Sequence, residues 1–166
     1  MLSPEGLRLR SGLMHAVRGF FHERRYLEVD TPVRLPVLLP EAHIRAVAAG
    51  DWFLQTSPEQ CMKRLLAQGS SRLFQICHCF RDGEWGRLHQ PEFTMLEWYR
   101  RGWSYRELMD ECEEFIRALV SRMPHLAGVA GQEALGRQGK IIPLSGPWER
   151  ITVDRAFRRY AGISTR

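Results

Sequence analysis

Two long segments of the chain carry hydrophobic residues at helical spacing. The first starts with Ser3 and Pro4, a cap residue and a proline suited to the first helical position, and its apolar positions continue to about residue 25. The second starts at Ser104, with Glu107 placed as in a capping box, and its apolar positions continue to residue 119. Both segments are predicted to be amphipathic helices.

Shorter elements lie between these two helices. The pattern predicts extended segments over residues 27–29 and 52–56. A short helix should follow the second of them, capped by Ser57 and closed by Gly69. Residues 33–50 show no clear period and are predicted to be a loop.

A hairpin is predicted in the middle of the chain. Residues 73–81 alternate in polarity, a polar loop with glycines follows, and residues 92–98 form a second strand-like run. After the second long helix, residues 124–147 are rich in glycine and proline, which indicates a surface connection. Thr152 is placed to cap a last short helix that ends near Gly162.

The composition fits one globular domain, because 166 residues with 44% hydrophobic content can bury a core. Charged residues interrupt every apolar patch in residues 2–35, so neither a membrane span nor a signal peptide is predicted there. We therefore expect a soluble, cytoplasmic protein. The formal net charge of +5 is compatible with polyanions such as ATP or RNA but does not choose between them.

The four cysteines show no spacing typical of a disulfide framework. Cys77 and Cys79 flank His78, a triplet that suggests a metal site. In an alternating strand, however, the two thiols share one face while the imidazole points to the other. Structural zinc needs four ligands at a recognisable spacing, and none is evident, so no metal site is predicted.

The hairpin loop and the returning strand concentrate charged and aromatic residues. Arg81 precedes the loop, Arg87 and His89 lie within it, and Phe93 and Glu97 lie on the second strand. Guanidinium groups neutralise phosphate and a phenyl ring can stack on a base, so this surface could bind a nucleotide. A solvated hairpin with ordinary cross-strand ion pairs is the alternative, and the charge pattern alone favours it.

Three segments, in order, resemble class II aminoacyl-tRNA synthetases of the lysyl type. The run from Phe80 to Glu84, with that from His89 to Tyr99, is similar to motif 2; Thr56 to Leu66 is similar to the segment before it; and Glu28 to Pro32 is similar to motif 1. The resemblance implies an α+β fold, a mainly antiparallel sheet flanked by helices. Residues 1–166 would be the incomplete, N-terminal part of the catalytic domain, with motif 1 at about 12–35 and motif 2 at about 78–100.

The resemblance also implies roles for individual residues. Arg81 would be catalytic, binding the α-phosphate of ATP and stabilising the charge that develops there. ATP, accompanied by Mg²⁺, would be bound by Arg81, Asp82, Gly83, Glu84, His89, Gln90 and Phe93, the last under the adenine. The amino acid would be bound by Ser57, Pro58, Glu59, Glu97 and Tyr99. The motif 1 region would form a homodimer.

Within this family, the short form of the enzyme is the elongation factor P lysine ligase. It activates a lysine-type amino acid with ATP and transfers it to a lysine side chain of elongation factor P. The order Arg87, Leu88, His89 resembles this branch, and motif 1 begins too near Met1 for a preceding anticodon-binding barrel. The alternatives are a lysyl-tRNA synthetase fragment that charges tRNA, and a non-catalytic dimeric binding relative.

The sequence departs from the family pattern at two points. Gly83 stands where the family has a glutamate that binds the adenine edge, and Glu84 compensates only if the loop is shifted. Motif 3, with its arginine for the γ-phosphate, is absent from the 166 residues. We therefore expect that these residues alone do not complete adenylation.

Overall fold

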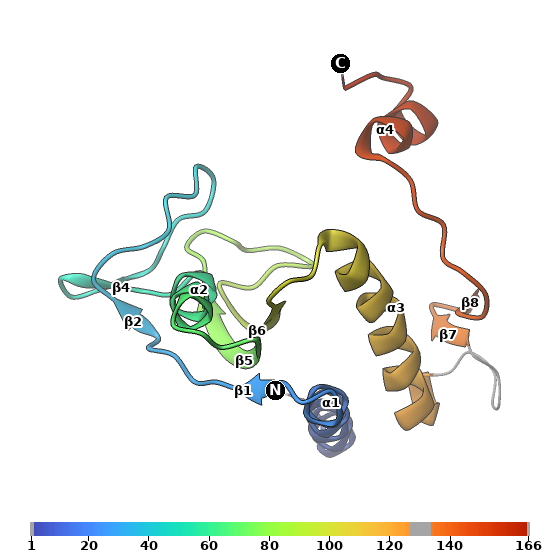
Figure 1. The fold of residues 1–166 in the computed structure, drawn as a ribbon, viewed down its shortest axis with the longest axis horizontal. Helices are drawn as coiled ribbons and strands as arrows, with labels where there is room; N and C mark the ends of the chain where they lie inside the picture. The colour runs from blue at the N-terminus through green and yellow to red at the C-terminus, as the bar shows by residue number, and fades with distance from the viewer. Residues whose placement is uncertain (1, 127–133, 166) are drawn as a thin grey trace. The chain divides into compact units, whose positions relative to one another are not determined.

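The computed structural model describes residues 2–126 and 134–165. They form two compact units, one of residues 17–108 and the other of the residues before 17 together with those from 109 onward. The two long helices are α1 (Pro4–Glu23) and α3 (Tyr105–Arg122), and each contributes residues to both units. Both were predicted from their hydrophobic period, and both are confirmed (Figure 1).

The main sheet of the unit 17–108 has the strand order β1-β5-β6. Strand β1 (Leu27–Glu28) runs parallel to β5 (Arg72–Phe80), which pairs antiparallel with β6 (Glu92–Arg100) along its whole length (Figure 1). The predicted hairpin is confirmed. Because the remaining strand pairs of the described residues are also antiparallel, the expected α+β class with a mainly antiparallel sheet is confirmed.

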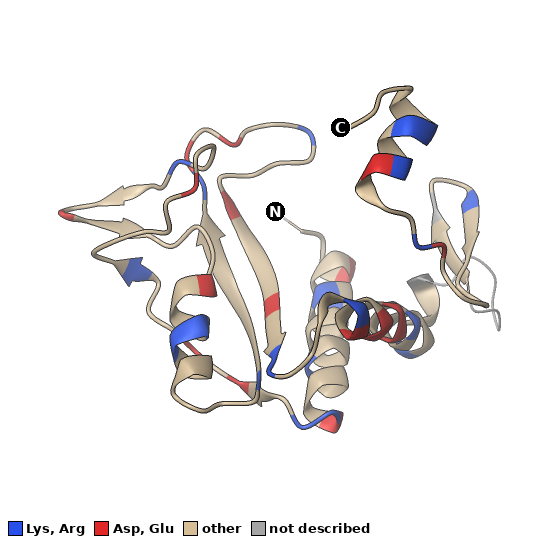
Figure 2. Cartoon of the chain, turned by 45° about the horizontal axis from the view of Figure 1, so that its top comes forward, with Lys and Arg blue, Asp and Glu red and all other residues tan. Residues whose placement is uncertain are grey.

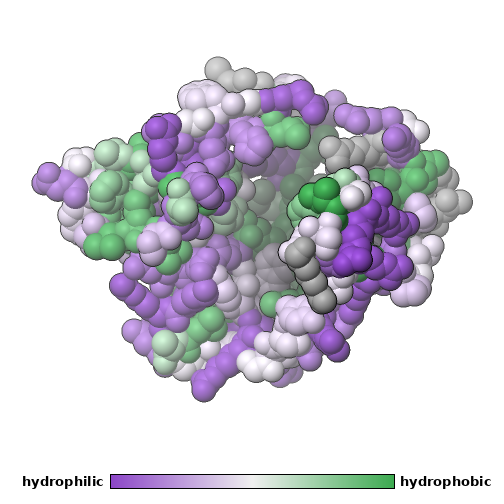
Figure 3. All heavy atoms as spheres, turned by 90° about the horizontal axis from the view of Figure 1, so that it is seen from above, coloured by the Kyte–Doolittle hydropathy of each residue, from purple (hydrophilic) through white to green (hydrophobic). Residues whose placement is uncertain are grey.

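A smaller sheet of the same unit has the order β2-β4-β3. The prediction of a loop over residues 33–50 is wrong, because this segment contributes two short strands to it. These strands pair with β4, and their own sequence has no period that would reveal them. The sheet consists of β2 (Arg34–Leu35), β3 (Ala48–Ala49) and β4 (Trp52–Leu54). Hydrophobic atoms are exposed over it, at the left of Figure 3.

Aromatic side chains form the core between α1 and the main sheet. Phe20 and Phe21 are fully buried on the last turns of α1. The Phe21 ring stacks on Phe74 of β5 at a centroid distance of 4.8 Å and lies 5.4 Å from the Trp98 ring of β6. Each such pair contributes about 1 kcal/mol beyond its buried area. The helix therefore fixes the hairpin on which the candidate site is built.

Helix α2 (Glu59–Ala67) follows β4, but its predicted cap was wrong. The N-cap is Pro58 rather than Ser57, whose hydroxyl instead accepts a hydrogen bond from the Glu59 N–H at 3.2 Å.

Helix α3 has the predicted capping box: the Ser104 hydroxyl accepts from the Arg106 N–H, and the Ser104 N–H donates to the Glu107 carboxylate.

The second unit contains the C-terminal elements. The segment over 124–147, predicted to be a surface connection, contains elements that were not predicted: a short 3-10 helix (Pro124–Leu126) and a hairpin of β7 (Ala134–Arg137) and β8 (Lys140–Pro143). The last helix, α4 (Val153–Ala161), is as predicted: the Thr152 hydroxyl accepts from the Arg155 N–H, and Gly162 closes it at φ +70°.

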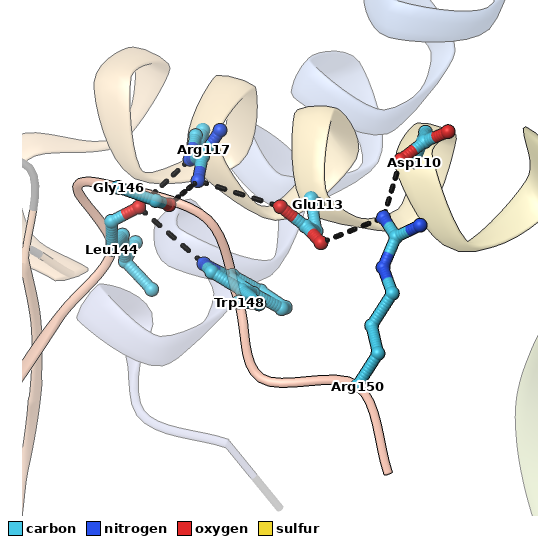
Figure 4. Close-up of polar contacts among 7 residues, drawn as sticks. All are labelled: Asp110, Glu113, Arg117, Leu144, Gly146, Trp148 and Arg150. Atoms are coloured by element: carbon cyan, nitrogen blue, oxygen red, sulfur yellow. Dashed lines mark hydrogen bonds and ion pairs between the residues drawn. The ribbon is translucent and has the colours of Figure 1, made fainter. Parts of the chain in front are cut away.

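A polar network attaches the segment after β8 to α3 (Figure 4). Glu113 lies between two arginines and accepts from Arg150 at 3.0 Å, while its other oxygen lies 3.5 Å from Arg117. The Arg117 guanidinium also donates to the backbone oxygens of Leu144 and Gly146. Such charge-assisted bonds are stronger than neutral ones and hold the chain against the helix.

In the part of the chain that the structure describes, none of the helices has both the length and the apolar character needed to cross a bilayer.

Candidate active site

Arg81 lies where β5 ends and is held by the backbone around it. Its N–H donates to the Pro91 carbonyl at 2.8 Å across the hairpin, and its side-chain Nε donates to the Thr56 carbonyl at 3.4 Å. Its guanidinium carbon lies 5.1 Å from the centre of the Phe93 ring. Since only 24% of the Arg81 side chain is exposed, its cation is fixed beside an aromatic face.

A cavity of about 230 Å³ opens beside this pair. It is lined by Arg81, Glu84, Leu88, His89, Gln90 and Phe93. Apart from Leu88, all of these are predicted ATP-binding residues, so the fold brings this part of the predicted site together. A cation next to an aromatic ring provides partners for a phosphate and for a base.

Asp82 and Gly83 do not line this cavity and lie toward residue 45. The Asp82 N–H donates to the Arg45 carbonyl at 2.8 Å, and its carboxylate lies 3.5 Å from the Arg45 guanidinium. Gly83 has φ +76°, and a Cβ there would stand 2.3 Å from an Arg45 side-chain nitrogen. The next residue, Glu84, brings its carboxylate to 3.9 Å from the Arg81 guanidinium. Compensation for Gly83 by Glu84 stays a prediction.

Carboxylates gather at the other end of the same sheet face. The Tyr99 hydroxyl donates to the Glu97 carboxylate two residues earlier on β6. Burial raises the pKa of Glu97, and the carboxylates of Glu59 and Glu41 raise it further, whereas the bond from Tyr99 lowers it. Burial and the bond to Glu97 raise the pKa of the Tyr99 phenol. This negative, half-buried surface is suited to an ammonium group.

The predicted substrate residues Ser57, Pro58 and Glu59 lie at and just before the start of α2. Glu59 begins the helix and forms an ion pair with Lys63 one turn later. Ser57 and Pro58 support it: Ser57 accepts the Glu59 N–H, and Pro58 is fully buried. Figure 2 marks the acidic and basic residues along α2 and β6.

Glu41 and Thr56 lie near these carboxylates, and neither was predicted from the sequence as a site residue. Glu41 lies in the segment predicted to be loop, and the Thr56 hydroxyl lies 3.5 Å from its carboxylate. Glu41 is 18 positions before Glu59 in the chain, and only the fold brings its charge close enough to act on Glu97. No local pattern in the sequence signals this proximity.

Sulfur atoms lie on the same face between Phe93 and the Glu97 carboxylate. The Sγ atoms of Cys77 and Cys79 are 3.8 Å apart, and the Cys79 Sγ is 3.9 Å from the Met95 Sδ. The contact between the thiols chiefly lowers the pKa of Cys77 and, with burial, raises that of Cys79. Within residues 2–126 and 134–165, no three His, Cys, Asp or Glu side chains cluster to hold a metal ion.

Comparison with known proteins gives consistent matches. The family described as tRNA synthetases class II (D, K and N) matches residues 3–166. The chain is 40% identical over 164 residues to an elongation factor P–(R)-beta-lysine ligase of Vibrio campbellii, covering 93% of this chain and 50% of that protein. It is 44% identical over 154 residues to the protein of the same name from Vibrio parahaemolyticus, covering 87% and 47%. The chain thus spans about half the length of the curated relatives it matches.

Proposed function

This chain belongs to the family of class II tRNA synthetases of the D, K and N type, and on that basis we propose that its site binds ATP and a lysine-type amino acid and contributes to joining them as an aminoacyl-adenylate, a reaction that residues 1–166 alone are not expected to complete. The names of the relatives support (R)-β-lysine as the amino acid and elongation factor P as the acceptor, and the family resemblance implies that the acceptor group is a lysine side chain. The observation that carries the proposal is the fixed Arg81 guanidinium beside Phe93 in the cavity.

In the activation step, a carboxylate oxygen of the amino acid attacks the α-phosphorus of ATP. The bond from this phosphorus to the oxygen that bridges to the β-phosphate breaks, and pyrophosphate leaves with the electron pair. Negative charge grows on the α-phosphoryl oxygens, where Arg81 is preorganised to stabilise it. Phe93 would stack on the adenine, and His89 and Gln90 would lie near the nucleotide.

Mg²⁺ would arrive with ATP, because it is bound largely through phosphate oxygens and keeps several waters. Glu84, the carboxylate that lines the cavity, is an oxygen ligand of the type that this ion accepts. By neutralising part of the phosphate charge, Mg²⁺ would add to the effect of the Arg81 guanidinium. Asp82 and Gly83 would shape the loop, since they face Arg45.

The amino acid would be recognised by its second ammonium group. Glu97, whose carboxylate accepts a hydrogen bond from Tyr99, offers a charge-assisted hydrogen bond to that group. The negative charge of Glu59 nearby would add to the attraction for the ammonium group. A neutral side chain of the same length would offer Glu97 no charge-assisted hydrogen bond. Ser57 and Pro58 would act by positioning Glu59.

In the transfer step, the amino group of an acceptor lysine attacks the carbonyl carbon of the adenylate. The bond from this carbon to the phosphate oxygen breaks, AMP leaves, and an amide forms with release of a proton. A tRNA hydroxyl is the alternative acceptor, but the names of the relatives favour elongation factor P.

We also propose that the protein is a cytoplasmic homodimer that associates through residues 12–35. Leu27 and Val33 in this region are 60% and 39% exposed. Covering such apolar side chains in a dimer would remove them from water. Sedimentation analysis of the wild type and of Leu27→Asp tests this, and a wild-type monomer at all concentrations would contradict it.

The proposed activity is tested by isothermal titration with ATP, lysine and a non-hydrolysable lysyl-adenylate analogue in the presence of Mg²⁺. The wild type is expected to bind the analogue tightly, and Arg81→Ala is expected to lose it. Arg101→Ala is the matched control, because it removes an exposed arginine beyond the end of β6. Absence of binding to a folded wild type would instead favour a non-catalytic binding relative.

A further inference from the structure

Three sulfur-containing side chains share one face of the β5–β6 hairpin. Cys77 and Cys79 lie two residues apart on β5 and therefore point to the same side. Met95 lies on β6 directly opposite Cys77 in the antiparallel register. The sequence showed the two cysteines, but the third sulfur is supplied by a residue 16 positions after Cys79.

The two separations from the Cys79 sulfur are those of ligands around one metal ion. Metal–sulfur bonds to a d¹⁰ ion are about 2.3 Å long, so three sulfurs around it lie roughly 4 Å apart. The observed separations are 3.8 Å between the thiols and 3.9 Å between Cys79 and Met95. We propose that Cys77, Cys79 and Met95 form a binding site for copper(I).

The ligand chemistry selects copper(I) over zinc. Thiolate and thioether sulfur are soft ligands that prefer Cu(I), whereas a structural zinc ion takes four ligands from Cys, His or carboxylate. A thioether completes the copper set but is a poor zinc ligand. On binding, each thiol gives its proton to the buffer, so one Cu(I) displaces two protons. The metal keeps its oxidation state, so no oxidant is needed.

The charge beside the sulfurs suits a cation. Cys77 and Met95 are half-buried, so two of the three side chains reach the surface, and Cys79 is fully buried. Glu97 projects from the same face of β6, two residues after Met95. Its carboxylate favours a bound cation over an empty pair of thiolates.

A bound copper ion would lie on the face of the β5–β6 hairpin between Phe93 and Glu97 of the candidate active site. In the β5–β6 register, Phe93 is opposite Cys79 on the nucleotide side, and Glu97 follows Met95 on the amino acid side. Copper is therefore expected to weaken binding of an adenylate analogue. Copper binding is inferred only from the sulfur geometry, so a failure of the proposed enzymatic activity would not contradict it.

The test is an anaerobic titration of the 166-residue chain against the coloured Cu(I) complex of bicinchoninate. The wild type is expected to remove one equivalent of Cu(I), and Cys77→Ser/Cys79→Ser to remove none. Met95→Leu keeps the volume of the side chain and is expected to lower the affinity by about tenfold through loss of one ligand.

The matched control is Cys61→Ser/Cys112→Ser, which removes the other two thiols of the chain and is expected to bind like the wild type. Cys79→Ala replaces the serine variant if a buried hydroxyl perturbs the fold, as judged by circular dichroism. The proposal is overturned if the Cys77/Cys79 variants take up copper like the wild type. It is equally overturned if uptake is lost in the Cys61/Cys112 control.

Discussion

The hydroxyl of Tyr99 donates a hydrogen bond to the carboxylate of Glu97 on the same face of β6. Burial and the nearby carboxylates of Glu59 and Glu41 raise the pKa of Glu97, and this bond opposes them. Tyr99 therefore helps to keep Glu97 ionised. An ionised Glu97 is the form that can hold an ammonium group.

Tyr99→Phe removes the donor and should raise the pKa of Glu97 further. Because lysine would bind the ionised carboxylate, its affinity should fall, and the pH at which binding is half-maximal should move upward. Calorimetric titration of lysine across pH 5 to 8 measures both effects. Tyr105→Phe removes a hydroxyl from an exposed tyrosine outside the site and serves as the control. An unchanged pH profile in Tyr99→Phe would contradict the role of the bond.

Glu97→Gln should abolish lysine binding and make the folded state more stable at pH 7. The pKa of Glu97 is above its ordinary value of 4.5 in the folded chain, so the folded state keeps this proton when the unfolded state has already lost it. Stability from this group is then present at low pH and is lost as the pH rises from 4.5 through the raised pKa.

Glutamine cannot titrate, so the variant should unfold at higher urea than the wild type at pH 7, and the difference should vanish near pH 4. Lysine binding should be lost. Glu92→Gln, at the exposed start of the same strand, controls for the loss of one negative charge. A stability difference independent of pH would show that burial of the Glu97 carboxylate is not its cause.

Phe93→Ala should weaken ATP binding by roughly 5- to 150-fold, because stacking of a base on an aromatic ring contributes about 1–3 kcal/mol. Phe93→Tyr keeps the ring face and should bind ATP nearly as well as the wild type. Titration with ATP and Mg²⁺ compares them. Equal affinity of Phe93→Ala and the wild type would place the adenine elsewhere.

Gly83→Ala should destabilise the fold by about 1 kcal/mol, because φ +76° is unfavourable for a residue with a Cβ. The new methyl group would also displace the Arg45 side chain, whose nitrogen lies 2.3 Å from the Cβ position. Gly86→Ala is the control, since a Cβ there meets nothing within 4 Å. Urea unfolding measures both variants, and equal midpoints would contradict the prediction.

Local patterns in the sequence were enough for the long elements and the family. The helical period of α1 and α3, the capping box at Ser104 and the alternation of β5 and β6 each depend on residues a few positions apart. The order of the synthetase-like segments indicated the family, which is confirmed. The site residues remain predictions, although the fold brings Arg81 and Phe93 together as expected.

Tertiary structure alone decided the features that depend on distant partners. Strands β2 and β3 are defined by hydrogen bonds to β4, and β2 pairs with residues of β4 that follow 18 and 20 positions later in the chain. The approach of Arg45 to Gly83 and the contact of Cys79 with Met95 join residues far apart in sequence. Hydrophobic periodicity reports which side of its own element a residue faces, but not which side chain from another element lies opposite.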